Sequence, residues 1–253
     1  MKKGRKFDII KDNIIKHKLS LSDPWYQLIM KMLEPIVCDI GRQRVVEVGC
    51  GLGGFTMNIA KMGGNIVGLD VSAKAVHIAR ELAKRLKLQD KVDLVVGDAQ
   101  FLPFKQQASD IVICSETLEH VPDYEKAFGE LSRITRKSGY LCVTVPNFLS
   151  TGLFENVILL LIGQPSYVKA NVCVEKEHVF HIFKLKKLLG KQNVQIITMR
   201  SVDFLHVPPR VRKILKIDES LRRISERLEA LFEDYVSPLR LMGANIGVLA
   251  RKE

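Results

Sequence analysis

The chain has 253 residues, of which 47% are apolar and 26% are charged, with 17 Gly and 9 Pro. A chain of this length buries roughly 70–75% of its unfolded surface, and the composition excludes collagen-like, low-complexity and wholly disordered proteins. The longest unbroken aliphatic run, Val157 to Ile162, is far shorter than the ~18–20 apolar residues of a spanning helix. We therefore expect a folded protein that does not cross a membrane.

The net charge of +11 comes from 39 Lys and Arg against 28 Asp and Glu. The basic residues gather mainly in residues 2–18, 184–191 and 210–216. Such clusters suit nucleic acid or anionic lipid, but a solvated basic face gives the same counts. Charge alone therefore does not choose a partner.

The five cysteines stand singly, and no C-x-x-C motif is present. This odd number predicts neither a disulfide framework nor a zinc ribbon. The basic start, Lys2 to Lys6, is followed by charged residues rather than by the apolar segment of an export signal. We predict a cytoplasmic protein.

The first predicted element is an amphipathic helix. Ser22-Asp23-Pro24 has the pattern of a helix start, and apolar residues follow at helical spacing from Leu28 to Ile40. We therefore separate an N-terminal part, residues 1–43, made of a basic arm and this helix, from a domain over residues 44–253.

Short apolar strands then alternate with helices. The pattern predicts strands at Arg44–Val48, Asn65–Leu69, Val92–Val96, Ile111–Cys114 and Tyr140–Val145, and helices at Gly54–Met62, Ser72–Leu86 and Tyr124–Arg136. Strands that are apolar on both faces belong to a mostly parallel sheet covered by helices on both sides. The predicted fold is doubly wound, Rossmann-like α/β.

The pattern becomes irregular after Pro146. We expect a short helix at Lys184–Lys191, a strand at Val194–Ser201, an amphipathic helix at Ile217–Phe232 and a last strand at Asn245–Ala250. The last two strands are expected to pair antiparallel. Residues 147–180 and 203–240 are predicted to be lid-like insertions.

A glycine-rich loop follows the first strand, where the next helix begins. Backbone N–H groups at such a junction bind nucleotide-like ligands, and glycine permits the tight turn. Gly49, Gly51 and Gly54 fit the dinucleotide pattern G-x-G-x-x-G, whereas Gly49, Gly51 and Gly53 fit the G-x-G-x-G loop of S-adenosylmethionine enzymes. The loop alone leaves both ligands open.

Three acidic residues bear on this choice. Glu47 lies two residues before the loop, where a carboxylate repels a pyrophosphate but can accept hydrogen bonds from an ammonium group or its water shell. Asp70 ends the second strand, where a carboxylate binds ribose hydroxyls in either case. Asp98 follows the third strand, where its side chain and the backbone N–H of Ala99 can contact an adenine edge. Together they favour a ligand that carries an amino acid.

These motifs, together with Asp110-Ile111-Val112 and Leu118-Glu119-His120, resemble those of class I S-adenosylmethionine-dependent methyltransferases between Arg44 and Pro146. The resemblance is greatest to the ubiquinone, menaquinone and glycan-tailoring branches. It implies a seven-stranded sheet whose last strand is antiparallel, with S-adenosylmethionine as cofactor. The cofactor-binding residues that it implies are Glu47, Gly49, Cys50, Gly51, Gly53, Asp70, Val71, Asp98, Ala99 and Ser115.

The acceptor site is expected after the fourth strand, in the sequence Ser115-Glu116-Thr117-Leu118-Glu119-His120. His120 is the candidate general base, because imidazole titrates near neutral pH. Glu116, Glu119 and His120 are the candidate catalytic residues, and their E-x-x-E-H run resembles a divalent-metal site of some ribose and quinone methyltransferases. His178 or His181 could add a ligand, but a structural role explains the run as well, and we assign no metal.

The predicted function is methyl transfer from S-adenosylmethionine to a small or lipid-like acceptor, with oxygen as the favoured atom. The apolar stretch from Phe148 to Tyr167 is compatible with an apolar lid or with peripheral membrane contact. One alternative is an RNA ribose 2′-O-methyltransferase, which is not favoured because no RNA-binding module is recognisable. Another is a methyltransferase-like binding protein without turnover. The acceptor and the oligomeric state stay open.

Overall fold

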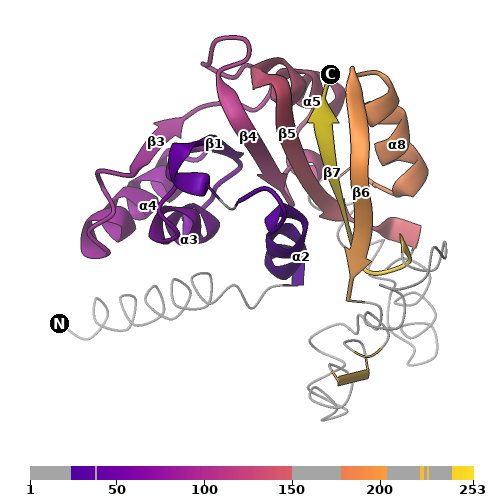
Figure 1. Cartoon of the computed structure of the whole chain (residues 1–253), viewed down its shortest axis with the longest axis horizontal. Helices are drawn as coiled ribbons and strands as arrows, with labels where there is room; N and C mark the ends of the chain where they lie inside the picture. Colours follow the sequence, from indigo (N-terminus) through magenta and orange to yellow (C-terminus); the bar gives the residue numbers. More distant parts are fainter. Residues whose placement is uncertain (1–23, 38, 150–177, 204–222, 225–226, 228–240) are drawn as a thin grey trace.

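The computed structural model describes residues 24–37, 39–149, 178–203, 223–224, 227 and 241–253. Its centre is a seven-stranded sheet in the order β3-β2-β1-β4-β5-β7-β6 (Figure 1). The strands are β1 (Arg44–Val48), β2 (Asn65–Asp70), β3 (Val92–Val96), β4 (Ser109–Ser115), β5 (Thr135–Pro146), β6 (Val194–Val202) and β7 (Asn245–Lys252). β1 to β5 pair in parallel, and β7 is antiparallel to both β5 and β6. The predicted fold class and the antiparallel last strand are confirmed.

The described helices are α2 (Pro24–Leu33), α3 (Gly54–Lys61), α4 (Ala73–Arg85), α5 (Tyr124–Ile134) and α8 (Ile182–Gly190), with short 3-10 turns at η1 (Ile40–Arg42) and η2 (Leu118–His120). Four of the helices agree with the predicted ones to within two residues, whereas α2 ends at Leu33, well before the Ile40 to which its apolar spacing extends. α5 ends two residues earlier than expected because β5 begins at Thr135. The Thr135 hydroxyl donates a 2.7 Å hydrogen bond back to the Leu131 carbonyl.

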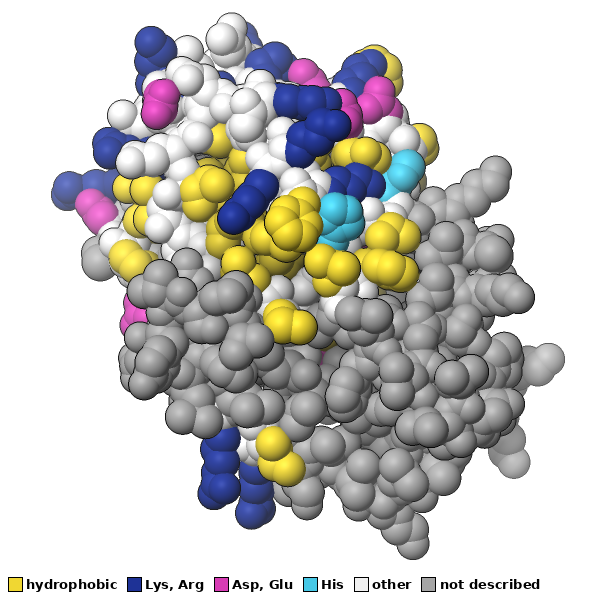
Figure 2. Space-filling model, turned by 90° about the vertical axis from the view of Figure 1, so that its right-hand side faces the viewer, with side chains coloured by type: hydrophobic (Ala, Val, Ile, Leu, Met, Phe, Trp, Pro, Cys, Tyr) yellow, Lys and Arg dark blue, Asp and Glu magenta, His cyan; other side chains and the backbone are white. Residues whose placement is uncertain are grey.

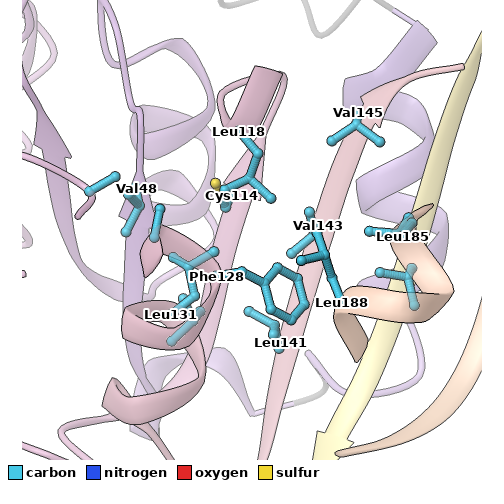
Figure 3. Close-up of a cluster of buried hydrophobic side chains, with 14 of the residues drawn as sticks. Val48, Cys114, Leu118, Phe128, Leu131, Leu141, Val143, Val145, Leu185 and Leu188 are labelled. Carbon is cyan, nitrogen blue, oxygen red and sulfur yellow. The ribbon is translucent and has the colours of Figure 1, made fainter. Parts of the chain in front are cut away.

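Neighbouring residues of the central strands enter different cores. Val45 and Ile111 belong to a core with α2, α3 and α4, whereas Val46 and Val112 belong to a core with α5 and α8. Figure 3 shows the second core, in which Phe128 and Leu131 of α5 lie near Leu141 and Val143 of β5. This division explains why the strands are apolar on both faces.

The helix α2 is part of the first core. Leu28, Ile29, Met32 and Leu33 are buried, and the helix packs against β7 and β5. The backbone of Gly247 in β7 approaches it so closely that a Cβ there would lie 2.6 Å from Cε of Met32. A helix that the sequence groups with the N-terminal basic arm therefore packs on the same sheet as the rest of the domain. The arm itself lies outside the described residues.

The connection from β3 to β4 has no helix. Instead, two side chains of α5 hold it: Arg133 donates to the carbonyls of Phe104 (2.8 Å) and Leu102 (3.1 Å), and Glu130 accepts from the backbone N–H of Leu102 at 2.8 Å. These bonds replace those that a helix would make within itself. They fix the segment that carries Asp98.

The predicted lid-like insertions and the predicted helix at Ile217–Phe232 lie almost wholly outside the described residues. Their flanks are described: the backbone N–H of Phe148 donates a 2.9 Å hydrogen bond to the carbonyl of Phe180. None of the helices in the described ranges has the length and apolar character needed to span a bilayer.

Candidate active site

The glycine loop between β1 and α3 has the backbone conformation that its sequence predicts. Gly49, Gly51 and Gly53 all have positive φ, at 80°, 52° and 78°. A Cβ at Gly49 would lie 2.1 Å from Oγ1 of Thr117, so the loop and the segment after β4 are in close contact. A Cβ at Gly51 would meet nothing within 4 Å. Packing against Thr117 thus requires glycine at position 49. At position 51 glycine suits the positive φ and leaves the space beside the backbone open.

The Asp70 carboxylate is fixed at the end of β2 by two backbone N–H groups. Gly51 donates to Oδ2 and Ser72 donates to Oδ1, each at 2.8 Å. The first of these bonds ties the glycine loop to the second strand. Both oxygens keep further acceptor capacity, because a carboxylate has about four lone-pair sites. Asp70 can therefore accept hydrogen bonds from a ligand without changing its position.

A cavity of about 510 Å³ opens at the carboxyl ends of β1 to β4. Its volume lies in the range of small-molecule pockets, and its place in the sheet is where doubly wound folds bind ligands. The lining residues are Val48, Gly49, Gly51, Leu69, Asp70, Val71, Gly97, Asp98, Ala99, Gln100, Glu116, Thr117, His120, Val121 and Pro122. The structure thus brings together eight of the predicted site residues: Gly49, Gly51, Asp70, Val71, Asp98, Ala99, Glu116 and His120.

Gln100 orients Asp98. The Gln100 backbone N–H donates to Oδ1 of Asp98 at 2.8 Å, and its side-chain amide donates to both carboxylate oxygens at 3.0 Å. The side-chain carbonyl oxygen of Gln100 accepts a 3.1 Å hydrogen bond from the backbone N–H of Asp123. Sequence reasoning missed Gln100, although its place two residues after Asp98 was a usable signal. The Asp98 carboxylate is held at the cavity wall.

Glu47 lies near the loop but does not line the cavity. It is 3% exposed and accepts a short hydrogen bond from the Thr56 hydroxyl of α3. The pKa of Glu47 is raised to about 8, mainly by burial and to a smaller extent by the charge of Asp70, against the lowering effect of the hydrogen bonds with Thr56. Contact between Glu47 and the cofactor's ammonium group stays a prediction.

Four more predicted residues lie behind the cavity wall. Cys50 and Gly53 are buried in the loop, and burial raises the pKa of the Cys50 thiol. The Ser115 hydroxyl shares a 2.9 Å hydrogen bond with Thr144 of β5. Glu119 is 2% exposed, and its backbone carbonyl accepts from the N–H of His178 at 2.7 Å. None of the four belongs to the cavity lining.

The residues after β4 form another part of the cavity wall. Glu116 has a φ of 45°, which is uncommon for a residue with a side chain and is concentrated at functional sites. Its Oε2 accepts a 2.8 Å hydrogen bond from the side-chain amide of Asn245, the first residue of β7. Sequence reasoning missed both Asn245 and Thr117. Thr117 lies inside the motif already singled out, whereas nothing in the spacing points to Asn245.

His120 lines the cavity with its side chain 53% exposed, and its Nε2 lies 3.8 Å from Oε1 of the buried Glu119. The arrangement suits a base that accepts a proton from a ligand in the cavity.

The histidines that were considered as further metal ligands have other contacts. The Nε2 of His178 lies 3.0 Å from the carbonyl of Pro122, and Nδ1 of His181 accepts from the backbone N–H of Lys184 at the start of α8. Within the described ranges, no group of three or more His, Cys, Asp or Glu side chains is arranged to hold a metal ion.

The lining of the cavity is acidic although the chain is basic. Asp70, Asp98 and Glu116 contribute carboxylates, and no Lys or Arg is among the lining residues of the described part. This field suits a ligand with positive charge and hydroxyl groups, and opposes a pyrophosphate. The residues therefore fit S-adenosylmethionine, whose sulfonium centre and ammonium group are positively charged and whose ribose carries hydroxyl groups.

Comparisons with known proteins agree with this fit. Residues 46–143 match the family model described as a methyltransferase domain. Demethylmenaquinone methyltransferase of Lactobacillus johnsonii is 30% identical over 60% of this chain and 59% of its own length. Ubiquinone biosynthesis O-methyltransferase of Pelagibacter ubique is 31% identical over 54% and 51%. Ajmaline N-methyltransferase of Rauvolfia serpentina is 28% identical over 74% and 63%.

A solved structure has the same fold. The S-adenosylmethionine-dependent methyltransferase of Mesorhizobium loti superposes with a TM-score of 0.60 over 88% of this chain and 96% of its own, at 17% identity. The chain spans only about half to three fifths of the length of the three curated relatives.

Residues 46–143 therefore carry a methyltransferase domain, and the whole described part has the fold of a solved S-adenosylmethionine-dependent methyltransferase. The acidic cavity of this domain fits S-adenosylmethionine as its cofactor. The resemblance of the sequence motifs is confirmed.

Proposed function

We propose that the protein transfers a methyl group from S-adenosylmethionine to an oxygen atom of a small or lipid-like acceptor. The observation that carries the proposal is that one cavity is lined both by Asp70 and Asp98 and by Glu116 and His120. When bound, S-adenosylmethionine supplies an electrophilic methyl group on a sulfonium centre. The residues of the chain need only orient the acceptor and remove its proton.

The roles follow from position. Asp70 and Asp98 are already held by backbone and amide donors, so they bind the cofactor without reorganising. Glu116, fixed by Asn245, accepts a hydrogen bond from the acceptor and orients it. His120 takes the hydroxyl proton at a ring nitrogen, and Glu119 stabilises the imidazolium that results.

The names of the relatives support a small acceptor, because two of them refer to quinones. Oxygen is supported by the name of one relative and by the base at the cavity, whereas another relative is named for nitrogen. The chain covers only part of each relative, so activity and acceptor are proposed for it rather than transferred. The lone cysteines remain the basis for proposing a cytoplasmic location.

Calorimetric titration with S-adenosylhomocysteine tests the cofactor site. We expect micromolar binding that Asp70→Ala abolishes, while Asp90→Ala, a matched change at an exposed position of the α4–β3 connection, leaves it unchanged. NAD serves as the parallel ligand. Binding of NAD without binding of S-adenosylhomocysteine would overturn the proposal from the glycine loop onward.

Methyl transfer to two classes of acceptor tests whether the methylated atom is oxygen or nitrogen. Phenolic quinol precursors and secondary amines are offered to the wild type and to His120→Gln. We expect transfer to the phenol, lost in the variant at neutral pH and partly regained at high pH, where the phenol ionises on its own. Transfer only to amines would show that the methylated atom is nitrogen and would overturn the proposal of oxygen. Tight cofactor binding without turnover on any acceptor, RNA included, would favour the binding-protein alternative.

A further inference from the structure

An exposed apolar surface lies on the side of the domain opposite β3. α8 places Leu185, Leu188 and Leu189 in the core, and its outer face carries Phe183, Lys186 and Lys187. Phe183 is 69% exposed, which is uncommon for a phenylalanine of a packed helix. The inner side of α8 thus stabilises the fold, and the outer side contributes nothing to the core.

The neighbouring edge strand extends this surface. β6 is the edge strand of the sheet, and its Ile196 is 41% exposed. Ile196 pairs with Ala250, whose side chain belongs to the core on the α8 side, so Ile196 lies on the same face of the sheet as α8. We call Phe183, Lys186, Lys187 and Ile196 the α8–β6 face. Figure 2, viewed from this side, shows hydrophobic side chains gathered with Lys, Arg and His among them.

The charge of this region has one sign. From His178 to Val202 the chain contains five Lys and Arg (Lys184, Lys186, Lys187, Lys191 and Arg200) and no Asp or Glu. Lys191 is paired with Glu125 of α5 at 2.5 Å, but the structure records no ion pair for Lys186 or Lys187 with the described residues. Two exposed lysines therefore flank the apolar side chains on the outer face of α8.

The α8–β6 face is connected to the rim of the cavity. His178, which precedes α8, contacts the carbonyl of Pro122, a lining residue, and its ring meets Tyr124 edge-on at 4.7 Å. Lys184 lies over the rings of Tyr124 and Phe180 at 4.1 and 4.5 Å. These contacts fix the start of α8, and with it Phe183, beside the rim of the cavity.

We propose that the α8–β6 face docks the protein on an anionic lipid membrane. An exposed aromatic and an exposed aliphatic side chain beside lysines match the interfacial surfaces of peripheral enzymes, which bury their apolar side chains at the headgroup boundary and pair their lysines with anionic lipid. Protein–protein interfaces are depleted of lysine, and RNA-binding surfaces use basic and aromatic side chains rather than exposed isoleucine. The chemistry of the face therefore favours lipid over either macromolecule.

Co-sedimentation of the full chain with vesicles tests this surface. We expect the wild type to bind vesicles of phosphatidylcholine mixed with phosphatidylglycerol, and to bind phosphatidylcholine alone weakly. The double variant Lys186→Glu/Lys187→Glu should lower the partition coefficient at least about tenfold, because each lysine near an anionic surface contributes about a factor of five. Phe183→Ser should weaken binding to a similar extent without changing the charge.

The control removes the same charge elsewhere. Lys61→Glu/Lys137→Glu changes two exposed lysines outside the face and should alter binding less than twofold. All variants should bind S-adenosylhomocysteine as the wild type does, which separates this test from that of the proposed function. Three results would overturn the proposal: no binding of the wild type to anionic vesicles, equal loss in the control, or loss of self-association rather than of vesicle binding in the face variants.

Discussion

The side-chain amide of Asn245 donates a 2.8 Å hydrogen bond to the carboxylate of Glu116, across 129 residues of sequence. Asn245 is 8% exposed and begins β7, the strand that lies between β5 and β6. Glu116 has a positive φ and lines the cavity. The last strand of the chain thus fixes the side chain of a residue that lines the cavity.

Replacing Asn245 should affect turnover and leave cofactor binding intact. Asn245→Leu removes a hydrogen bond to a charged group, which contributes roughly 1.5–3 kcal/mol, so we expect kcat to fall about tenfold or more. Affinity for S-adenosylhomocysteine should stay within twofold. The measurement is initial methyl-transfer rate beside calorimetry.

Asn245→Asp gives a readout that a structural role would not produce. Two adjacent carboxylates repel each other, and the loss should be partly reversed as the pH falls and one of them is protonated. Asn193→Leu, at an exposed position just before β6, is the control and should change neither constant. A pH profile of Asn245→Asp parallel to that of the wild type would refute the positioning role.

Alanine at Gly49 and at Gly51 should have different effects. Both residues have positive φ, which costs an alanine about 1–2 kcal/mol, but only at Gly49 would the new Cβ meet Thr117, at 2.1 Å. Overpacking adds about 1–3 kcal/mol. We expect Gly49→Ala to lower the free energy of unfolding by about 3 kcal/mol and Gly51→Ala by about 1 kcal/mol in urea titrations.

The affinity for S-adenosylhomocysteine should be more sensitive to alanine at position 51 than at position 49, the reverse of the order expected for stability. The Cβ of Gly51→Ala enters open space beside the cavity, so this variant should weaken S-adenosylhomocysteine binding more than its small loss of stability suggests. Gly49→Ala combined with Thr117→Ala should regain part of the lost stability, because two of the three closest atoms are removed. Equal unfolding energies for the two single variants would contradict the assigned contact.

The strands, and the positions of the glycine loop and Asp70 at strand ends, could be predicted because their signals are local. Val45 and Val46 enter different cores, which makes the strand apolar on both faces and marks a buried parallel strand within five residues. The glycines and Asp70 each lie directly at a strand end. Their meeting place follows from the parallel topology, since carboxyl ends of parallel strands share one edge.

The rest depends on contacts between distant segments. Asn245 reaches Glu116 only because β7 inserts between β5 and β6, and no spacing rule encodes that order. The amphipathic pattern of α2 shows that one side is buried but does not name the sheet as its partner. Glu119 and Ser115 belong to the predicted motif, but neither lines the cavity: Glu119 is buried, and the Ser115 hydroxyl is bonded to Thr144.

Stability should depend on the pH through Glu47. Burial raises its pKa from 4.5 to about 8, so the folded protein holds a proton that the unfolded chain releases between these values. The free energy of unfolding contributed by this group is therefore complete below about pH 4.5 and falls, by a few kcal/mol in total, as the pH rises to 8. Glu47→Gln should remove this slope in urea titrations across that range.

The exposed Glu34→Gln serves as the matched control and should keep the wild-type slope. Above pH 8 the Glu47→Gln variant should be more stable than the wild type, since it has no buried charge to form. Identical slopes for Glu47→Gln and the wild type would show that Glu47 ionises alike in the folded and unfolded chains.

Arg133 should control both stability and cofactor affinity through the β3–β4 connection. It donates to the carbonyls of Phe104 and Leu102 and pairs with Glu130 at 2.6 Å, an arrangement that lowers the pKa of Glu130. Arg133→Leu leaves these acceptors without their donor and should cost about 2–3 kcal/mol of unfolding free energy. The segment that holds Asp98 would loosen, so binding of S-adenosylhomocysteine should weaken as well.

Two further variants separate the hydrogen bonds of Arg133 from its charge. Arg133→Lys keeps the charge but not the planar fork, so its stability should fall between those of the wild type and Arg133→Leu. Arg42→Leu breaks an exposed pair with Asp39 and should cost below about 1 kcal/mol. If Arg133→Leu were as stable as Arg42→Leu and bound S-adenosylhomocysteine equally well, the connection would be held by its apolar side chains instead.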